Sequence, residues 1–298
     1  MNIFLTGGTG FIGSYVVKNL SDAGHNITIL ARNPDKVPAL SGLKGVTILP
    51  GLLSDFDVIE GALKKKDALI HIALGWGELA TSMLKNDTFP SIFLFETAGR
   101  FGVSQIIYTS STAAAGNIPH NLWAVKSAIP NDYYGATKAA SESFLYATSE
   151  KYSVQCNIIR PGYTFGNPVI DGASIQPDKR FLEIVQKAKQ GATIDIFKND
   201  GTQFIWAGDL ARVYKAIIES KFNKKCFYCL GTDYFTWERI ALKAIELLKS
   251  ESRIRIKNKK ASGAPGLFDV SEIKKAFDFE FHSWDKIVEH LGYLIDVL

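Results

Sequence analysis

A glycine-rich segment close to the N-terminus limits what this chain can fold into more than any other feature of its sequence. It runs Thr6-Gly7-Gly8-Thr9-Gly10-Phe11-Ile12-Gly13, follows a strand-like apolar run and opens a helical pattern. In that position one glycine allows a tight turn, a second lets the backbone approach a pyrophosphate, and a third lets the helix pack closely. The segment therefore predicts a dinucleotide site with contacts from Gly7, Thr9, Gly10, Phe11, Ile12 and Gly13.

Short apolar runs alternate with helical periodicity from residue 1 to about 160, a pattern typical of parallel strands joined by helical crossovers. The predicted strands are Asn2 to Thr6, Asn26 to Ala31, Val46 to Leu49, Ala68 to Ile72, Gln105 to Thr109 and Val154 to Ile159. The predicted helices are Phe11 to Ala23, Phe56 to Lys65, Ser82 to Phe101 and Tyr134 to Lys151. Pro90 is expected to break or begin a helix within the third of these.

After Arg160 the alternation loosens, with helices predicted at Lys179 to Gln190, Leu210 to Ser220, Thr236 to Ser250 and Ser283 to Leu291, and a strand at Cys226 to Leu230. We therefore predict an α/β fold, a Rossmann-type doubly wound parallel sheet with a smaller C-terminal substrate-binding lobe. Residues 1–160 would form the NAD(P)-binding domain, with strands and helices near 190–230 returning to it. Residues 161–298 would form the interleaved lobe.

Composition and charge exclude several classes of protein. The formal net charge of +4 is small for 298 residues, and the basic clusters at 64–66 and 257–260 end predicted elements, so we expect no nucleic-acid partner. Cys226 and Cys229 form a CxxC without a second ligand pair, which predicts buried thiols and no metal. No apolar run approaches the roughly 20 residues of a membrane span. With no secretory signal visible, a cytoplasmic location is expected.

The end of the second predicted strand bears on the choice of cofactor. Dinucleotide folds commonly place a carboxylate there to bind the adenosine ribose of NAD, but this chain has Leu30-Ala31-Arg32-Asn33. The guanidinium of Arg32 is suited to a 2'-phosphate. The sequence therefore favours NADP, with NAD as the alternative.

Tyr134 and Lys138 lie four residues apart, one turn along the same face of a predicted helix. An ammonium held beside a phenol favours the phenolate and lowers the pKa of the tyrosine, which lets it exchange protons near neutral pH. The run Thr109-Ser110-Ser111-Thr112 places hydroxyls at the carboxyl edge of the sheet, where open α/β folds bind ligands. His71, on an apolar strand, is predicted to be a core histidine.

Taken together, these segments resemble the extended branch of the short-chain dehydrogenase/reductase superfamily, the NAD(P)-dependent epimerase/dehydratase family. The resemblance covers almost the whole chain. It lies in TGGTGFIG at 6–13, HIA at 71–73, YTSST at 108–112, YGATK at 134–138 and RPGYTFG at 160–166.

The resemblance implies a role for each matching residue. Tyr134 would be the general acid/base, Lys138 would bind the nicotinamide ribose and lower the tyrosine pKa, and Ser111 would hold the substrate oxygen. Ser111 is preferred to Ser110 because it lies five residues before Gly116. Further cofactor contacts are implied for Leu53, Ala73, Thr109, Pro161 and Gly162. The resemblance also suggests a homodimer through helices near 91–101 and 134–151.

The chain departs from the family pattern in its substrate region. Ser111-Thr112-Ala113 lacks the acids that dehydration needs, and Tyr163 replaces an asparagine that nucleotide-sugar epimerases use. An aromatic ring suits a flatter, less charged substrate than a diphosphate. We therefore predict an apolar wall of Trp76, Tyr163, Phe165 and Trp206, with substrate contacts from Trp76, Thr112, Tyr163 and Phe165 and a shape set in part by the loop Gly116 to Asp132.

These features predict an NADP-dependent oxidoreductase that moves a hydride between nicotinamide and a small carbonyl or alcohol substrate. In this hypothesis Tyr134 protonates the carbonyl oxygen and Ser111 stabilises its developing charge. One alternative is a nucleotide-sugar epimerase of the same family. The other is a regulator that senses NADP without chemistry, although such a protein has no need of a Ser-Tyr-Lys centre.

Overall fold

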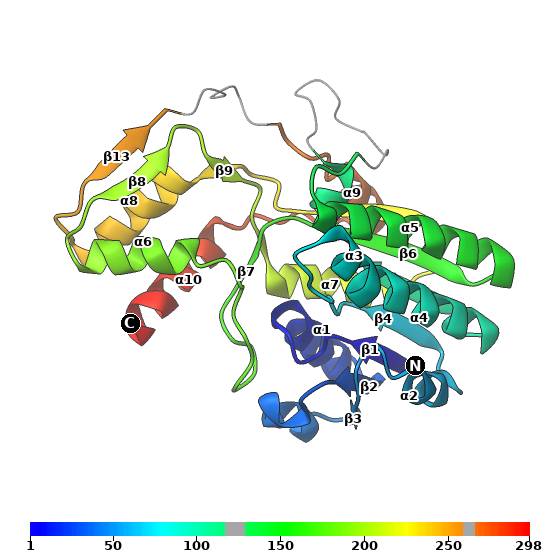
Figure 1. Cartoon of the computed structure of the whole chain (residues 1–298). Helices are drawn as coiled ribbons and strands as arrows, with labels where there is room; N and C mark the ends of the chain where they lie inside the picture. Colours follow the sequence, from blue (N-terminus) through cyan, green and yellow to red (C-terminus); the bar gives the residue numbers. More distant parts are fainter. Residues whose placement is uncertain (117–128, 259–265) are drawn as a thin grey trace.

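The structure of the chain, a computed structural model, describes residues 1–116, 129–258 and 266–298 (Figure 1). Most of the loop Gly116 to Asp132 and part of the basic cluster at 257–260 therefore lie outside the described residues. No helix of the described ranges combines the length and the apolar character needed to cross a bilayer.

A seven-stranded parallel sheet forms the centre of the molecule, in the order β11-β6-β5-β4-β1-β2-β3. Its strands are β1 (Asn2–Thr6), β2 (Asn26–Ala31), β3 (Val46–Pro50), β4 (Ala68–His71), β5 (Gln105–Thr109), β6 (Gln155–Pro161) and β11 (Lys225–Cys229). The six strands predicted before residue 160 all occur there. The predicted Rossmann-type α/β fold is confirmed.

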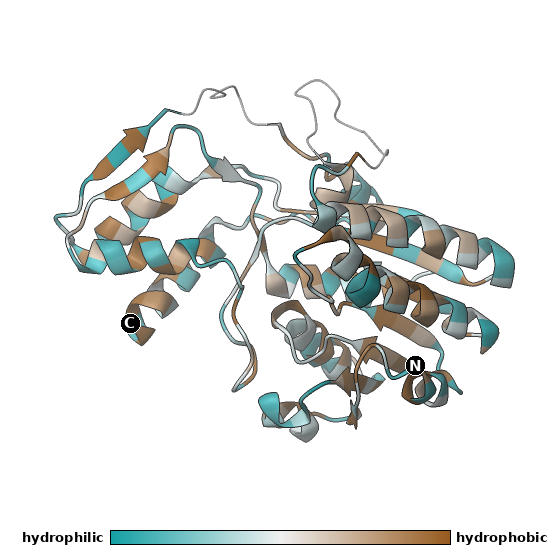
Figure 2. Ribbon diagram, in the orientation of Figure 1, coloured by the Kyte–Doolittle hydropathy of each residue, from teal (hydrophilic) through white to brown (hydrophobic). Residues whose placement is uncertain are grey.

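Helices cover both faces of the sheet because alternate strand residues point to opposite sides. In β1, Ile3 and Leu5 join a core with α1 (Phe11–Asp22) and α7 (Ala207–Ile218). Phe4 instead joins the core under α2 (Phe56–Leu63), α4 (Phe89–Arg100) and α5 (Tyr133–Tyr152). Figure 2 shows the apolar, brown residues concentrated in the strands, while the helices carry both colours.

The helix predicted over 82–101 is interrupted. It begins as α3 (Ala80–Met83), widens into a π-helical turn at Leu84–Thr88, and continues as α4, in which Pro90 lies within the first turn. A proline is tolerated at this point because first-turn amides have no partner within the helix. The π-helical turn places Asp87 where it is fully buried.

Most of the remaining elements form a smaller lobe on the other side of the molecule in Figure 1, whereas α9 (Ser271–Phe277) packs on β11 of the large sheet. Helices α6 (Arg180–Lys189), α8 (Trp237–Leu248) and α10 (Trp284–Val297) pack around an aromatic core. The sequence pattern missed helix α9 (Ser271–Phe277), the pair β8 (Ile194–Phe197) with β13 (Ile254–Lys257), and the two-residue strands β7 (Thr164–Phe165), β9 (Gly201–Thr202), β10 (Ile205–Trp206) and β12 (Phe235–Thr236). Such short segments carry little periodicity.

The two parts of the chain are interleaved. Strand β11 pairs with β6 and helix α7 packs on α1, so both return to the large sheet. Strand β8 does not return, because it pairs with β13 in the lobe. The division at residue 160 itself stays a prediction.

Candidate functional site

The glycine turn after β1 is packed so closely that side chains would not fit. Gly7 has φ +80°, and a Cβ on it would lie 2.6 Å from the backbone nitrogen of Ala73. A Cβ on Gly13 would lie 2.0 Å from the carbonyl oxygen of Gly7, while the amide of Gly10 donates to that oxygen at 3.0 Å. These glycines thus hold the turn, the start of α1 and the segment after β4 together.

The start of α1 is open to an anion. Its N-cap is Gly10, which makes no side-chain capping bond, and no acid lies in the first turn. The first amides of a helix lack intrahelical acceptors and carry the positive end of its dipole. A phosphate is the ligand that such an end binds at the turn of a dinucleotide fold. The described residues therefore fit a dinucleotide cofactor.

At the end of β2, Arg32 is exposed, and Asn33 caps the short 3-10 helix Pro34–Lys36 by accepting from the amide of Asp35. Within the described ranges no carboxylate forms an ion pair with Arg32. Leu53 is half-buried after β3. At the end of β2 itself the chain therefore carries a cation, while the nearby carboxylate of Asp55 accepts from the amide of Leu52.

Ser111 and Tyr134 are brought together by the packing of a helix end on a short turn. Ser111 caps the 3-10 helix Thr112–Ala115, and Asp132 caps α5 by accepting from the amide of Gly135 at 2.6 Å. A Cβ on Gly135 would lie 2.3 Å from the carbonyl oxygen of Ala113, so this glycine lets the helix sit against the turn. The Ser111 side chain lies close enough to Tyr134 to lower the pKa of its phenol.

Lys138, one turn further along α5, is buried and has a partner that sequence reasoning missed. Its Nζ lies 3.5 Å from Oδ2 of Asp87, while Oδ1 of Asp87 accepts from the amide of Gly75 at 3.0 Å. The Lys138 ammonium also lies 5.8 Å from the centroid of the Tyr134 ring. No sequence pattern marks Asp87, because only the π-helical turn carries it into the interior.

Asp87 changes the electrostatics expected of this centre. Burial raises the pKa of Tyr134, the hydrogen bond from Ser111 lowers it, and the negative charges of Asp87 and Asp132 raise it further. Burial lowers the pKa of Lys138, and Asp87 raises it. The net shift of the Tyr134 pKa is upward, chiefly because the phenol is buried. That Lys138 lowers the pKa of Tyr134 stays a prediction.

Two further residues near this edge have their polar atoms occupied. His71 lies between the hydroxyls of Thr6, at 2.6 Å, and Ser91, at 2.8 Å, and burial lowers its pKa to about 3. It is a core histidine, as predicted. The hydroxyl of Thr109 forms a hydrogen bond with that of Tyr214 at 2.6 Å, and Thr109 is buried.

Pro161 and Gly162 lie where the strand β6 ends. Pro161 is buried, the amide of Gly162 donates to Cys229 of the neighbouring strand, and a Cβ on Gly162 would lie 2.3 Å from the Leu230 side chain. This segment and Ser111 follow adjacent strands of the sheet. It therefore lies at the same carboxyl edge as the Ser111 and Tyr134 pair.

The predicted apolar wall does not form. Phe165 is fully buried among Phe181, Phe204 and His290, so its place is in the core of the lobe and not in a substrate site. Tyr163 packs in the same aromatic cluster.

Of the four wall residues, only one is close to Tyr134. Trp206 packs edge-to-face on Tyr15 of α1. The ring of Trp76 lies 6.3 Å from that of Tyr134. Thr112 is half-buried in the turn that follows Ser111.

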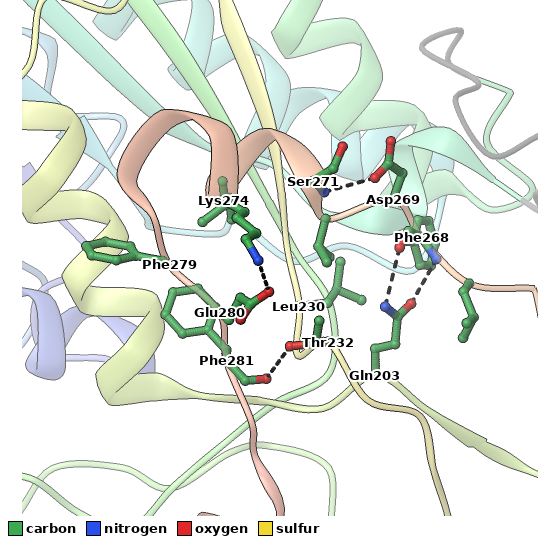
Figure 3. Close-up of a pocket in the computed structure, with 13 residues that line it drawn as sticks. Gln203, Leu230, Thr232, Phe268, Asp269, Ser271, Lys274, Phe279, Glu280 and Phe281 are labelled. Carbon is green, nitrogen blue, oxygen red and sulfur yellow. Dashed lines mark hydrogen bonds and ion pairs between the residues drawn. The ribbon is translucent and has the colours of Figure 1, made fainter.

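A cavity of about 340 Å³ lies beside the end of β11, where Leu230 follows the strand (Figure 3). None of the predicted site residues lines it within the described ranges. Its polar groups are satisfied internally: Gln203 exchanges hydrogen bonds with the backbone of Phe268, and Lys274 pairs with Glu280. The cavity is separate from the Tyr134 centre.

Comparison with known proteins gives consistent matches. Residues 3–231 match the sequence model of the NAD dependent epimerase/dehydratase family. The chain is 24% identical, over 93% of its length and 91% of the relative, to a dTDP-4-dehydro-6-deoxy-D-allose reductase from a Streptomyces species. It is 29% identical to a 3 beta-hydroxysteroid dehydrogenase/Delta 5-->4-isomerase of Mycobacterium tuberculosis, over 55% of this chain and 47% of that protein.

Solved structures share the whole fold. The UDP-glucuronic acid 4-epimerase from Bacillus cereus in complex with NAD superimposes with a TM-score of 0.84 at 17% identity, covering 100% of this chain and 99% of that one. This likeness establishes the fold of the described chain.

Proposed function

Because the chain belongs to the NAD-dependent epimerase/dehydratase family, an enzyme family of the extended short-chain dehydrogenase/reductase type, we propose that it is an NADP-dependent oxidoreductase acting on a carbonyl or alcohol substrate. One observation carries this proposal. Ser111 and Tyr134 lie next to each other beside a buried Lys138, at the carboxyl edge of a sheet whose first turn is a glycine cradle.

In the direction of reduction, Tyr134 donates its phenolic proton to the carbonyl oxygen of the substrate. Ser111 donates a hydrogen bond to the same oxygen and stabilises the negative charge that develops there. When bound in the glycine cradle, NADPH would supply the hydride for the carbonyl carbon. The products are an alcohol and NADP⁺, and Tyr134 regains its proton from solvent.

Lys138 contributes its positive charge from the next turn of α5 after Tyr134. Its ammonium lies within reach of both Tyr134 and Asp87, so a proton lost by the phenol leaves a phenolate facing a cation. Binding of a nicotinamide ribose would be a second task of the same amine. Asp87 holds the amine in place for both.

The cofactor is proposed to lie along the glycine turn and past Ala73, with its pyrophosphate at the start of α1 and its 2'-phosphate at Arg32. Leu53 and the backbone of Thr109, Pro161 and Gly162 would complete the contacts. The exposed guanidinium without an ion-pair partner supports NADP over NAD. The substrate would enter beside Trp76 and Thr112, between the large sheet and the lobe.

A nucleotide-sugar epimerase is the second candidate, and the names of solved structures with the same fold favour it. These structures are named as epimerases bound to UDP-sugars, whereas a relative matched over 91% of its length is named as a reductase. Another relative is named for a steroid substrate. The names therefore differ both in the reaction and in the substrate. A regulator without chemistry is disfavoured, because it would not need Ser111, Tyr134 and Lys138 together.

Thermal denaturation separates these functions. A ligand that binds the folded chain raises its melting temperature, and the stabilisation grows with the logarithm of the ligand concentration relative to its Kd. We expect NADPH to stabilise the chain more than NADH, and UDP-sugars to have little effect. Strong stabilisation by a UDP-sugar would favour the epimerase.

Turnover then tests the centre itself. With a substrate found by following NADPH consumption, the Tyr134→Phe variant should lose roughly 10²- to 10⁴-fold in kcat/KM, the usual contribution of general acid catalysis. Its affinity for NADPH should stay within about threefold of the wild type. Undiminished turnover by this variant would contradict the proton-transfer role.

A further inference from the structure

We propose that Trp76 is a fixed stacking platform for the substrate and that the substrate carries a planar, apolar group next to its reacting carbonyl. This inference rests on the proposed oxidoreductase function and adds the substrate class. The observation behind it is that Trp76 has a closely packed backbone but an exposed side chain.

The backbone around Trp76 is held on both sides. A Cβ on Gly75 would lie 1.8 Å from the carbonyl oxygen of Asn86, and a Cβ on Gly77 would lie 2.4 Å from the hydroxyl of Ser82. The side chain of Asn86 donates to the carbonyl oxygen of Trp76 at 2.9 Å. Two flanking glycines and a side-chain hydrogen bond therefore fix the segment against α3 and the π-helical turn.

The indole ring is nevertheless left in solvent. Trp76 is 64% exposed, among the most exposed large apolar side chains of the described residues. A large ring held in water by a rigid segment gives up the free energy that burial would supply. Single exposed apolar side chains are common, so the inference depends on where this ring lies.

The position of the ring points to the substrate as its partner. Trp76 follows β4 at the carboxyl edge of the sheet, and its ring lies 6.3 Å from that of Tyr134, inclined at 40°. A group that stacks on the open face of the indole would then lie beside the phenol that exchanges the proton. The same Asp87 that pairs with Lys138 binds the amide of Gly75, so platform and acid/base centre share one support.

The charges nearby argue against a diphosphate at this place. Lys138, the cation next to Tyr134, is buried and paired with Asp87, so its charge is not offered to a phosphate. An indole face favours flat apolar rings, which it binds by offset or edge-to-face stacking. An aryl ketone combines the ring and the reacting carbonyl in one molecule.

The first experiment measures binding without chemistry. Protein saturated with NADP⁺ cannot reduce a ketone, so titration with acetonaphthone and with cyclohexyl methyl ketone compares a flat and a saturated ring. We expect the wild type to bind acetonaphthone about tenfold more tightly, and Trp76→Ala, but not Trp76→Phe, to abolish that difference. The matched control is Phe144→Ala, which removes another exposed aromatic ring, on the outer part of α5, and should leave the difference intact.

Two outcomes would overturn the inference. The first is that the wild type does not prefer the flat ketone, or that Trp76→Ala keeps the same preference. The other is a loss of NADPH affinity in Trp76→Ala, which would assign the ring to the cofactor site. Failure of the proposed function is a different result: acetonaphthone would bind in a Trp76-dependent way, yet the wild type with NADPH would not reduce it.

Discussion

The carboxylate of Asp87 and the ammonium of Lys138 lie 3.5 Å apart, and both side chains are buried. The pair joins the π-helical turn before α4 to the first turns of α5. It also bears on Tyr134, because the negative charge of Asp87 adds to the effect of burial in raising the pKa of that phenol.

Replacing Asp87 with Asn should shift the pH profile of reduction. Loss of the carboxylate removes an influence that raises the pKa of Tyr134 and one that raises the pKa of Lys138, so both pKa values fall. Tyr134 must be protonated to act as the acid, and the alkaline limb of log kcat/KM should therefore move to lower pH. The unpaired buried cation should also lower the free energy of unfolding by about 3–5 kcal/mol. An alkaline limb that moves in Asp209→Asn as well would mean that the shift is not specific to this pair.

Ser111 and Ser110 should differ sharply in their effect on turnover. Ser111 lies close enough to Tyr134 to lower the pKa of its phenol, whereas the backbone of Ser110 pairs with Ile159 of β6. Ser111→Ala should lower kcat by roughly 10²- to 10³-fold, the usual loss for one donor to a developing oxyanion. Ser110→Ala should change it by less than about tenfold. Steady-state kinetics with one substrate decides between them, and the reverse order would transfer the role to Ser110.

Arg32 should distinguish the two cofactors. Removing a charge-assisted hydrogen bond costs about 1.5–3 kcal/mol, so Arg32→Ala should weaken NADPH binding by about 10- to 100-fold. NADH binding should be unaffected because it lacks the 2'-phosphate. Arg212→Ala, which removes an exposed arginine paired with Asp209, is the control. Titration calorimetry with both cofactors measures the difference, and equal losses for NADPH and NADH would contradict the assignment.

A methyl group should be tolerated at one helical glycine and not at another. In Gly13→Ala the new Cβ meets the Gly7 carbonyl oxygen, so α1 must move away from the turn, and we expect a loss of about 1–3 kcal/mol in stability together with cofactor binding. Gly61 lies in α2 with open space around it. Gly61→Ala should therefore stabilise the chain by up to about 1 kcal/mol. Urea denaturation with and without NADPH tests both variants.

His290 should make the fold sensitive to mild acid. Burial lowers its pKa to about 4, and its ring lies between Gln176 at 2.8 Å and Asn167 at 2.6 Å. In the unfolded chain a histidine titrates near 6.5, so protons favour the unfolded state as the pH falls from about 6.5 towards 4. Stability should fall over that range by up to about 3 kcal/mol from this residue. The His290→Gln variant should show a shallower decline; an equally steep one would place the acid sensitivity elsewhere.

The sequence by itself determined the sheet, the glycine turn and the spacing of Tyr134 and Lys138. Strand and helix periods, a strand-to-helix glycine turn and a one-turn spacing are local, so the order of residues along the chain is enough to reveal them. The strands before residue 160 and the core role of His71 were predictable for this reason.

Only the tertiary structure decided what surrounds the Tyr134 centre. Asp87 became the partner of Lys138 because a π-helical turn carried it inward, Phe165 entered the core of the lobe, and Trp76 stayed in solvent. Sequence periodicity does not predict such contacts, because residues far apart in sequence meet only when helices pack on the sheet. Burial then fixes their charges, since desolvation acts on a side chain only once its neighbours are in place.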